Sequence, residues 1–114
     1  MTVRVKICGI TSSEQAQMAQ QYGADALGLV IYEKSPRYVN LEQAAKIRAS
    51  ITSDCLAIVL LVNPSESIVK QVIEQVKPDF IQFHGDETPE FCHQFDFPFI
   101  RAVRMREGLD INTE

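Results

Sequence analysis

The segment that decides the fold reads Val3-Arg4-Val5-Lys6-Ile7-Cys8-Gly9-Ile10-Thr11. Its alternating β-branched residues predict a buried strand that breaks at Gly9. The Ser/Thr-x-x-Glu spacing of residues 11–14 predicts a capped helix directly after this strand. Cys8 is therefore expected at the carboxyl end of the first strand, where parallel α/β proteins gather their chemistry. A thiol there is a candidate base or nucleophile, although an arbitrary cysteine is more often a buried packing residue.

The composition is that of an ordinary globular protein. The 114 residues suffice for a single domain spanning 1–114, with 46% hydrophobic and 23% charged residues. A formal charge of -4 disfavours nucleic acid as a partner, because that binding needs clustered Lys and Arg. No apolar run approaches the roughly 20 residues of a membrane span, and no signal-peptide layout is present, so we expect a cytoplasmic protein without membrane contact. The three cysteines lack CxxC spacing, which predicts free thiols.

The rest of the chain alternates apolar runs with helical patterns. Continuous apolar runs predict parallel strands covered on both faces at residues 26–32, 56–62, 80–85 and 99–104. Amphipathic patterns predict helices over residues 14–22, 40–51, 64–76 and 88–95. This order is a repeated βα unit without any linker, and right-handed crossovers then lead to a doubly wound sheet or to a (β/α)₈ barrel. Periodicity alone leaves both architectures open.

Polar residues mark where the later helices begin. Asn40, followed by Gln43, predicts the start of the second helix. Asn63 is expected to cap the third helix, with Pro64 at its first helical position. The pair Asp86-Glu87 follows the fourth predicted strand, and we interpret these carboxylates as helix-capping or solvated groups rather than as a general acid.

Three segments resemble the successive signatures of the phosphoribosylanthranilate isomerase family. They are Lys6-Ile7-Cys8-Gly9-Ile10-Thr11, then residues 23–28 together with 35–39, then Gln82-Phe83-His84-Gly85-Asp86-Glu87. The resemblance covers nearly the whole chain and implies a (β/α)₈ barrel, the TIM-barrel class. It also implies an Amadori rearrangement in tryptophan biosynthesis, in which N-(5′-phosphoribosyl)anthranilate, an anionic phosphosugar, becomes 1-(2-carboxyphenylamino)-1-deoxyribulose 5-phosphate. Neither a metal nor a cofactor is expected.

The resemblance implies roles for three side chains. Cys8 becomes the general base that takes the C2′ proton, and an ordinary thiol pKa of about 8.5 needs only modest help near neutrality. Arg37 is implied to bind the anthranilate carboxylate, whose two oxygens a guanidinium can bind at once, whereas without the family a solvated loop arginine is favoured. His84 is expected to line the floor of the cleft and contact substrate, with a structural histidine as the alternative. Cys55 and Cys92 are expected to be packing residues.

The chain departs from the family in its length. A complete barrel needs roughly 200 residues or more, whereas the pattern here supplies five βα units, so we expect an incomplete barrel. The resemblance puts the general acid, an aspartate ending a sixth strand, beyond this chain, together with the phosphate-binding loops at helix N-termini. Asp110 lies past the fifth predicted strand and is not assigned as the acid. The chain alone is therefore expected to be inactive.

Five barrel strands would expose an apolar inner face and two open edges, and open edges pair readily with other chains. We therefore expect self-association, or a missing C-terminal half. This leads to a second hypothesis, a catalytically incompetent, oligomerising half-barrel. A third, an enzyme related to ribulose-phosphate epimerase, is disfavoured because those enzymes use metal-binding His and Asp sets, and this sequence contains only two histidines.

Overall fold

The computed structural model describes residues 5–101, and all statements on structure refer to this range. Its elements, in chain order, are β1 (Lys6–Cys8), α1 (Ser13–Gln21), β2 (Ala26–Val30), α2 (Leu41–Ala49), β3 (Leu56–Leu61), α3 (Glu66–Gln71), the π-helix η1 (Val72–Val76), β4 (Phe80–Phe83), α4 (Pro89–His93) and β5 (Phe99–Arg101). The predicted strand positions 3, 4 and 102–104, and Asp110, lie outside the described residues. No helix within 5–101 has the length and apolar character needed to cross a membrane.

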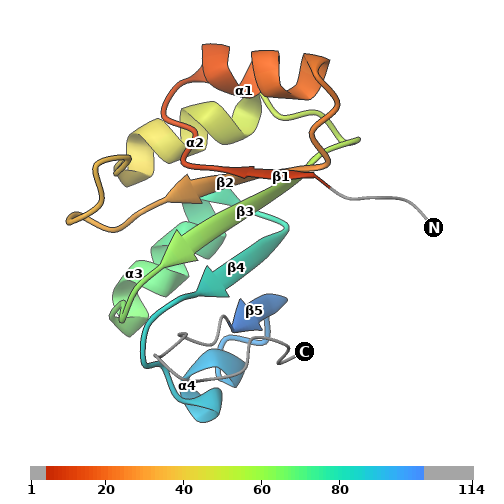
Figure 1. Ribbon diagram of the computed structural model, residues 1–114. Helices are drawn as coiled ribbons and strands as arrows, with labels where there is room; N and C mark the ends of the chain where they lie inside the picture. Colours follow the sequence, from red (N-terminus) through yellow and green to blue (C-terminus); the bar gives the residue numbers. More distant parts are fainter. Residues whose placement is uncertain (1–4, 102–114) are drawn as a thin grey trace, which may run out of the picture.

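The five strands form one parallel sheet in the order β1-β2-β3-β4-β5 (Figure 1). Each crossover therefore places the next strand on the same side of the previous one. A doubly wound sheet would reverse direction at some strand, and no reversal occurs among the described residues. The monotonic order is that of a (β/α)₈ barrel opened after five strands.

The core lies between the sheet and the helices. Every second residue of the central strands faces the helices and is buried; these residues are Leu27, Leu29, Ala57, Val59, Leu61, Ile81 and Phe83. The apolar sides of the helices pack against them through Ala16, Ala19, Ala44, Ile47, Val69, Val72 and Val76. Cys55 and Cys92 are buried in the same cluster as free thiols, which confirms their expected packing role.

The opposite, inner face of the sheet is curved. Lys6 lies on this face of β1, and its Nζ donates a hydrogen bond to Oε1 of Gln82 on β4. Two strands lie between β1 and β4, which in a flat sheet would separate them by about 14 Å. The two side chains meet because the sheet bends around its inner face, as the wall of a barrel does.

The edge strand β1 differs from the buried strand that its sequence predicts. Val5 and Ile7 remain 46% and 37% exposed, and Lys6 and Cys8 are exposed as well. β1 has a neighbour on one side only, since β2 is its sole partner within the described residues. Its β-branched pattern indicated a strand correctly, but burial depends on a neighbour that the local sequence does not specify.

The first two helix starts show how local the capping signals are. Ser12, not Thr11, caps α1: its Oγ accepts a hydrogen bond from the Gln15 backbone N–H at 3.1 Å. Thr11 instead donates its own N–H to Oε1 of Gln15 at 2.8 Å. The predicted start of α2 is confirmed, with Asn40 and Gln43 forming a reciprocal capping box.

The third helix begins and ends differently from the prediction. Ser65 caps α3, and Asn63 stands before it with a positive φ of 46°, so Pro64 is not the first helical residue. The helix then widens into η1 and stops at Lys77, whose left-handed conformation (φ 56°) lets its N–H bond to the Val72 carbonyl at 3.1 Å.

Candidate functional site

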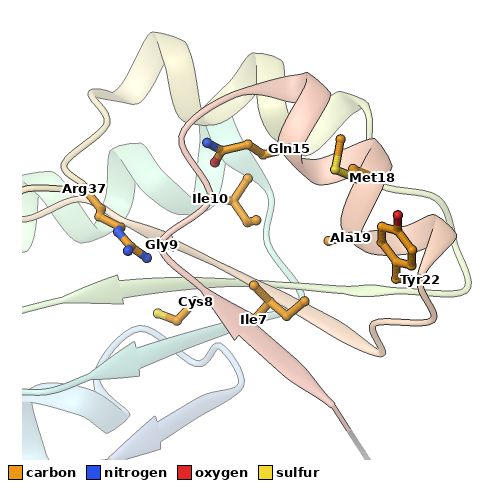
Figure 2. Close-up of a pocket in the computed structure, with 9 residues that line it drawn as sticks. All are labelled: Ile7, Cys8, Gly9, Ile10, Gln15, Met18, Ala19, Tyr22 and Arg37. Carbon is orange, nitrogen blue, oxygen red and sulfur yellow. The ribbon is translucent and has the colours of Figure 1, made fainter.

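A pocket of about 400 Å³ lies where β1 ends, beside α1 (Figure 2). Residues 7–10 form one wall, and Met18 of α1 and Tyr22, which directly follows α1, contribute to another. Arg37 reaches the pocket from the loop between β2 and α2. Cys8 and Arg37, which the sequence singled out separately, therefore line the same pocket, at the end of it that is nearest the carboxyl end of β1.

Cys8 is held at this edge by hydrogen bonds from the residues that follow it. The backbone N–H groups of Gly9 and Ile10 both donate to the carbonyl of Gly28, at 3.0 and 3.1 Å. Cys8 itself pairs with Gly28 across the ladder between β1 and β2. These contacts fix the end of β1 against β2 and leave the thiol exposed, in contrast to the two buried cysteines.

Arg37 lies directly over Gly9, and its guanidinium points toward Gly9 and Cys8 in Figure 2. A Cβ atom on residue 9 would stand 2.5 Å from Arg37 Cδ and 2.8 Å from Nη1, so the Arg37 side chain would have to move away if residue 9 carried one. Gly9 also has φ +89°, a conformation that disfavours any other residue. Within residues 5–101 the Arg37 guanidinium forms no ion pair.

The loop that carries Arg37 is fixed by its own backbone. The Arg37 N–H donates to Ser35 Oγ at 3.1 Å, and the Tyr38 N–H donates to the Ser35 carbonyl at 3.1 Å. The Val39 N–H then returns to the carbonyl of Val30, at the end of β2, at 3.0 Å. A short turn with these bonds holds the exposed arginine close to the strand ends.

His84 follows β4 at the same edge of the sheet. Its backbone N–H donates to the Leu61 carbonyl at 2.9 Å, and its side chain is exposed. It is not among the residues that line the pocket of Cys8 and Arg37. The structure thus brings two of the three predicted site residues together and leaves His84 at the end of β4, which β3 separates from β2.

The expected capping or solvated role of Glu87 is wrong. Glu87 is 7% exposed, and its two carboxylate oxygens accept hydrogen bonds from the backbone N–H groups of Asn63 at 2.7 Å and Gly85 at 2.9 Å. Thr88 caps α4 instead, and Asp86 is exposed. The sequence did not reveal that the Glu87 carboxylate joins two loops. The Asn63 N–H comes from a different loop, and the local pattern around residue 87 contains no sign of it.

Burial changes the acidity of the two core thiols, Cys55 and Cys92. Burial raises the pKa of the Cys55 thiol, and the nearby carboxylates of Asp25 and Asp79 raise it further. Burial also raises the pKa of the Cys92 thiol, which Arg101 lowers in part. Among the described residues, no group of three His, Cys, Asp or Glu side chains is placed to hold a metal ion.

Comparison with known proteins gives one consistent family. The family model described as N-(5'phosphoribosyl)anthranilate (PRA) isomerase matches residues 5–114. The N-(5'-phosphoribosyl)anthranilate isomerase of Nitrosomonas europaea is 44% identical over 111 residues, covering 97% of this chain and 53% of that protein. That of Alcanivorax borkumensis is 47% identical over 113 residues, with 98% and 52% covered. The chain thus spans about half the length of the curated relatives it matches.

Solved structures agree with the sequence relatives. The phosphoribosyl anthranilate isomerase of Thermotoga maritima superposes with a TM-score of 0.85 at 36% identity, covering 90% of this chain and 51% of that one. A phosphoribosyl anthranilate isomerase in complex with reduced 1-(o-carboxyphenylamino)-1-deoxyribulose 5-phosphate gives 0.85 and 36%, covering 90% and 54%. These neighbours are TIM-barrel proteins, so the five-stranded sheet is an incomplete (β/α)₈ barrel, as the family resemblance implied.

Proposed function

Because the chain belongs to the N-(5'-phosphoribosyl)anthranilate isomerase family, we propose that it supplies part of the active site of such an isomerase in tryptophan biosynthesis. The observation that carries the proposal is the placement of Cys8 and Arg37 together where β1 ends, with the Arg37 side chain lying over Gly9, the residue after Cys8. One solved relative carries a reduced form of the rearranged phosphosugar, which is the kind of ligand we propose for this site. The substrate is then a small anionic phosphosugar.

In the proposed reaction Cys8 is the general base. A general acid first protonates the furanose ring oxygen, and the ring opens to a Schiff base between C1′ and the anthranilate nitrogen. Cys8, as thiolate, then removes the proton from C2′, and the C2′ electron pair moves to give an enolamine. Tautomerisation of the enolamine yields the ketone at C2′. The exposure of Cys8 and its place at the strand end support this role.

Arg37 is the proposed anchor for the anthranilate carboxylate. Its guanidinium has no ionic partner within residues 5–101, and its side chain lies over Gly9, the residue after Cys8. A planar guanidinium binds both carboxylate oxygens at once and so fixes the aromatic end of the substrate. His84, exposed at the end of β4, is proposed to contact substrate from a second strand end.

The ring-opening acid and the phosphate-binding loops are proposed to come from a part of the barrel that this chain does not contain. Five strands lie in the described sheet, whereas a closed barrel of this type has eight. The chain by itself is therefore expected to lack a complete substrate-binding site and to be inactive. Its proposed partner is a C-terminal half that closes the barrel.

A second candidate function is a non-catalytic, self-associating half-barrel. The observation that favours it is a set of exposed apolar side chains in or next to β1 and α1: Val5, Ile7, Met18 and Tyr22, with Tyr22 83% exposed. They flank a strand edge that no described strand covers. One related structure is a monomeric form generated from the dimeric isomerase of Thermotoga maritima, so association occurs in that relative.

The test of the proposed function is a chimera in which residues 1–114 are joined to the part of the Nitrosomonas europaea isomerase that this chain does not match. We expect the chimera to isomerise N-(5′-phosphoribosyl)anthranilate. Cys8→Ala should lower kcat about 10²–10⁴-fold, the usual contribution of a positioned base. Cys55→Ala, which removes a buried thiol at the amino end of β3, is the matched control and should keep kcat. Activity of the Cys8→Ala chimera within about threefold of the parent would contradict the proposal.

A further inference from the structure

Gly28 stands directly beneath the Cys8 thiol. The two residues are partners in the ladder between β1 and β2, so their side-chain positions lie on the same inner face. A Cβ atom on residue 28 would stand 2.9 Å from Cys8 Sγ, 3.3 Å from its Cα and 3.4 Å from its Cβ. The sulfur therefore occupies the space that any side chain at residue 28 would need.

The backbone does not explain a glycine at this position. Gly9 and Gly23 have φ values of +89° and +91°, which only glycine adopts freely, and Gly28 has no such conformation. Gly28 lies in the interior of β2 between Leu27 and Leu29, a position where glycine weakens a strand. What distinguishes the position is the close approach of the Cys8 sulfur.

The same residue also holds the chain that carries the thiol. The Gly28 carbonyl accepts both the Gly9 and the Ile10 N–H groups, at 3.0 and 3.1 Å. These bonds hold the end of β1 against β2 at Gly28, whose lack of a side chain leaves room for the Cys8 sulfur. The close approach of Gly28 to the sulfur and the two hydrogen bonds to the Gly28 carbonyl together restrict the position of the Cys8 thiol.

We propose that Gly28 is a positioning residue: it seats the Cys8 thiol against β2 and so sets where the thiolate meets the C2′ proton. This role rests on the proposed function of Cys8 as base. A side chain at residue 28 moves the sulfur away from its seat, and a base that is displaced by about 1 Å loses much of its rate. Substrate binding through Arg37 does not involve this seat.

The seat itself is tested by a double-mutant cycle on the 114-residue chain. Unfolding equilibria are measured in urea for the parent, Gly28→Ala, Cys8→Ala and the double variant. We expect Gly28→Ala to raise the unfolding equilibrium constant about tenfold more in the parent than in the Cys8→Ala background. In the Cys8→Ala background the added methyl group meets no sulfur. If Gly28→Ala fails to fold while the double variant folds, the proposal is equally supported.

Gly23→Ala is the matched control for the cycle. A Cβ there meets no atom within 4 Å, and its cost comes from φ alone, so it should be the same in both backgrounds. An equal cost of Gly28→Ala in both backgrounds, or loss of folding in both, would overturn the proposal, because backbone rather than sulfur would then oppose the methyl group.

The positioning role is tested by kinetics in the chimera described above. We expect Gly28→Ala to lower kcat at least about tenfold with KM nearly unchanged, whereas a general loss of structure would affect both. An active parent chimera with unchanged kcat in Gly28→Ala would overturn the role. An inactive parent chimera together with coupling in the urea cycle would refute the proposed function and leave the seat itself established.

Discussion

The carboxylate of Glu87 accepts a hydrogen bond from the backbone N–H of Asn63 at 2.7 Å and so joins the loop after β4 to the loop after β3. Its other oxygen accepts the N–H of Gly85 at 2.9 Å, and the Asn63 side chain returns a bond by accepting the Asp86 N–H at 2.8 Å. A Cβ on residue 85 would stand 2.6 Å from Asn63 Oδ1, so the two loops are in close contact. This pair fixes the segment that directly follows His84.

Removing the Glu87 carboxylate should therefore destabilise the fold. Glu87→Ala leaves two backbone N–H groups without acceptors in a site that is 7% exposed, and we expect a loss of about 2–4 kcal/mol in the free energy of unfolding. Glu87→Gln keeps one acceptor oxygen and should cost less. Urea denaturation measures both. Asp86→Ala, the exposed neighbour, is the control and should stay within about 0.5 kcal/mol, and an equal cost for both alanine variants would contradict the assignment.

Arg37→Ala should weaken substrate binding more than it slows chemistry. The anthranilate carboxylate is remote from C2′, so its contact with Arg37 is similar in the ground and transition states. Loss of a charge-assisted contact is expected to raise KM of the chimera roughly 10- to 150-fold while kcat changes little. Arg37→Lys retains the charge but lacks the planar guanidinium, so its KM should lie between that of the parent and that of Arg37→Ala. An unchanged KM with a lower kcat would give Arg37 a different role.

Stability should fall at alkaline pH through the buried thiols. Burial raises the pKa of Cys55 in the folded chain, so the unfolded chain releases this proton at a lower pH than the folded chain does. The free energy of unfolding is then highest below the ordinary thiol pKa and decreases as the pH rises above it. Urea titrations between about pH 7.5 and 9.5, the range around an ordinary thiol pKa, measure how steeply the free energy of unfolding decreases with pH. Cys55→Ala should make this decrease less steep, whereas Ser53→Ala, a change at an exposed neighbour, should not. An equal slope in both variants would remove Cys55 as a cause.

The chain alone should self-associate through the β1 edge. Ile7 and Tyr22 are exposed at this edge, and β1 has no second neighbour among the described strands. Light scattering at micromolar concentration is expected to give a mass above that of the 12.8 kDa monomer. Ile7→Lys should shift it toward the monomer, whereas Glu74→Lys, on the exposed side of η1, should not. A stable monomer of the parent chain would contradict the open-edge account.

Local signals were read correctly where their partners are also local. Asn40 and Gln43 lie within one helical turn, and their capping box was predicted and is confirmed. Asn63 carries the same kind of signal but has a positive φ and caps no helix; its backbone N–H bonds to Glu87 in another loop. The sequence pattern shows that Asn63 favours a helix start. It does not show that the Asn63 N–H bonds to a carboxylate from another loop.

The site was predictable in its residues but not in its arrangement. Resemblance to a family singled out Cys8 and Arg37, and the structure brings both to one pocket. The contribution of Gly28 depends on the register between β1 and β2, which sets residue 28 beside the sulfur. Register between strands follows from the whole sheet, so the role of this glycine emerges only once the strands are paired.

The most direct test of the central claim, that this chain supplies the base to a barrel completed by a second part, is complementation. The purified chain is mixed with a fragment that carries the part of the Nitrosomonas europaea isomerase it does not match, and isomerisation of N-(5′-phosphoribosyl)anthranilate is followed. We predict no turnover by either part alone, turnover by the mixture, and at least about a hundredfold loss when the chain carries Cys8→Ala. Turnover by the chain alone, or by the mixture with Cys8→Ala at the parent rate, would contradict the account.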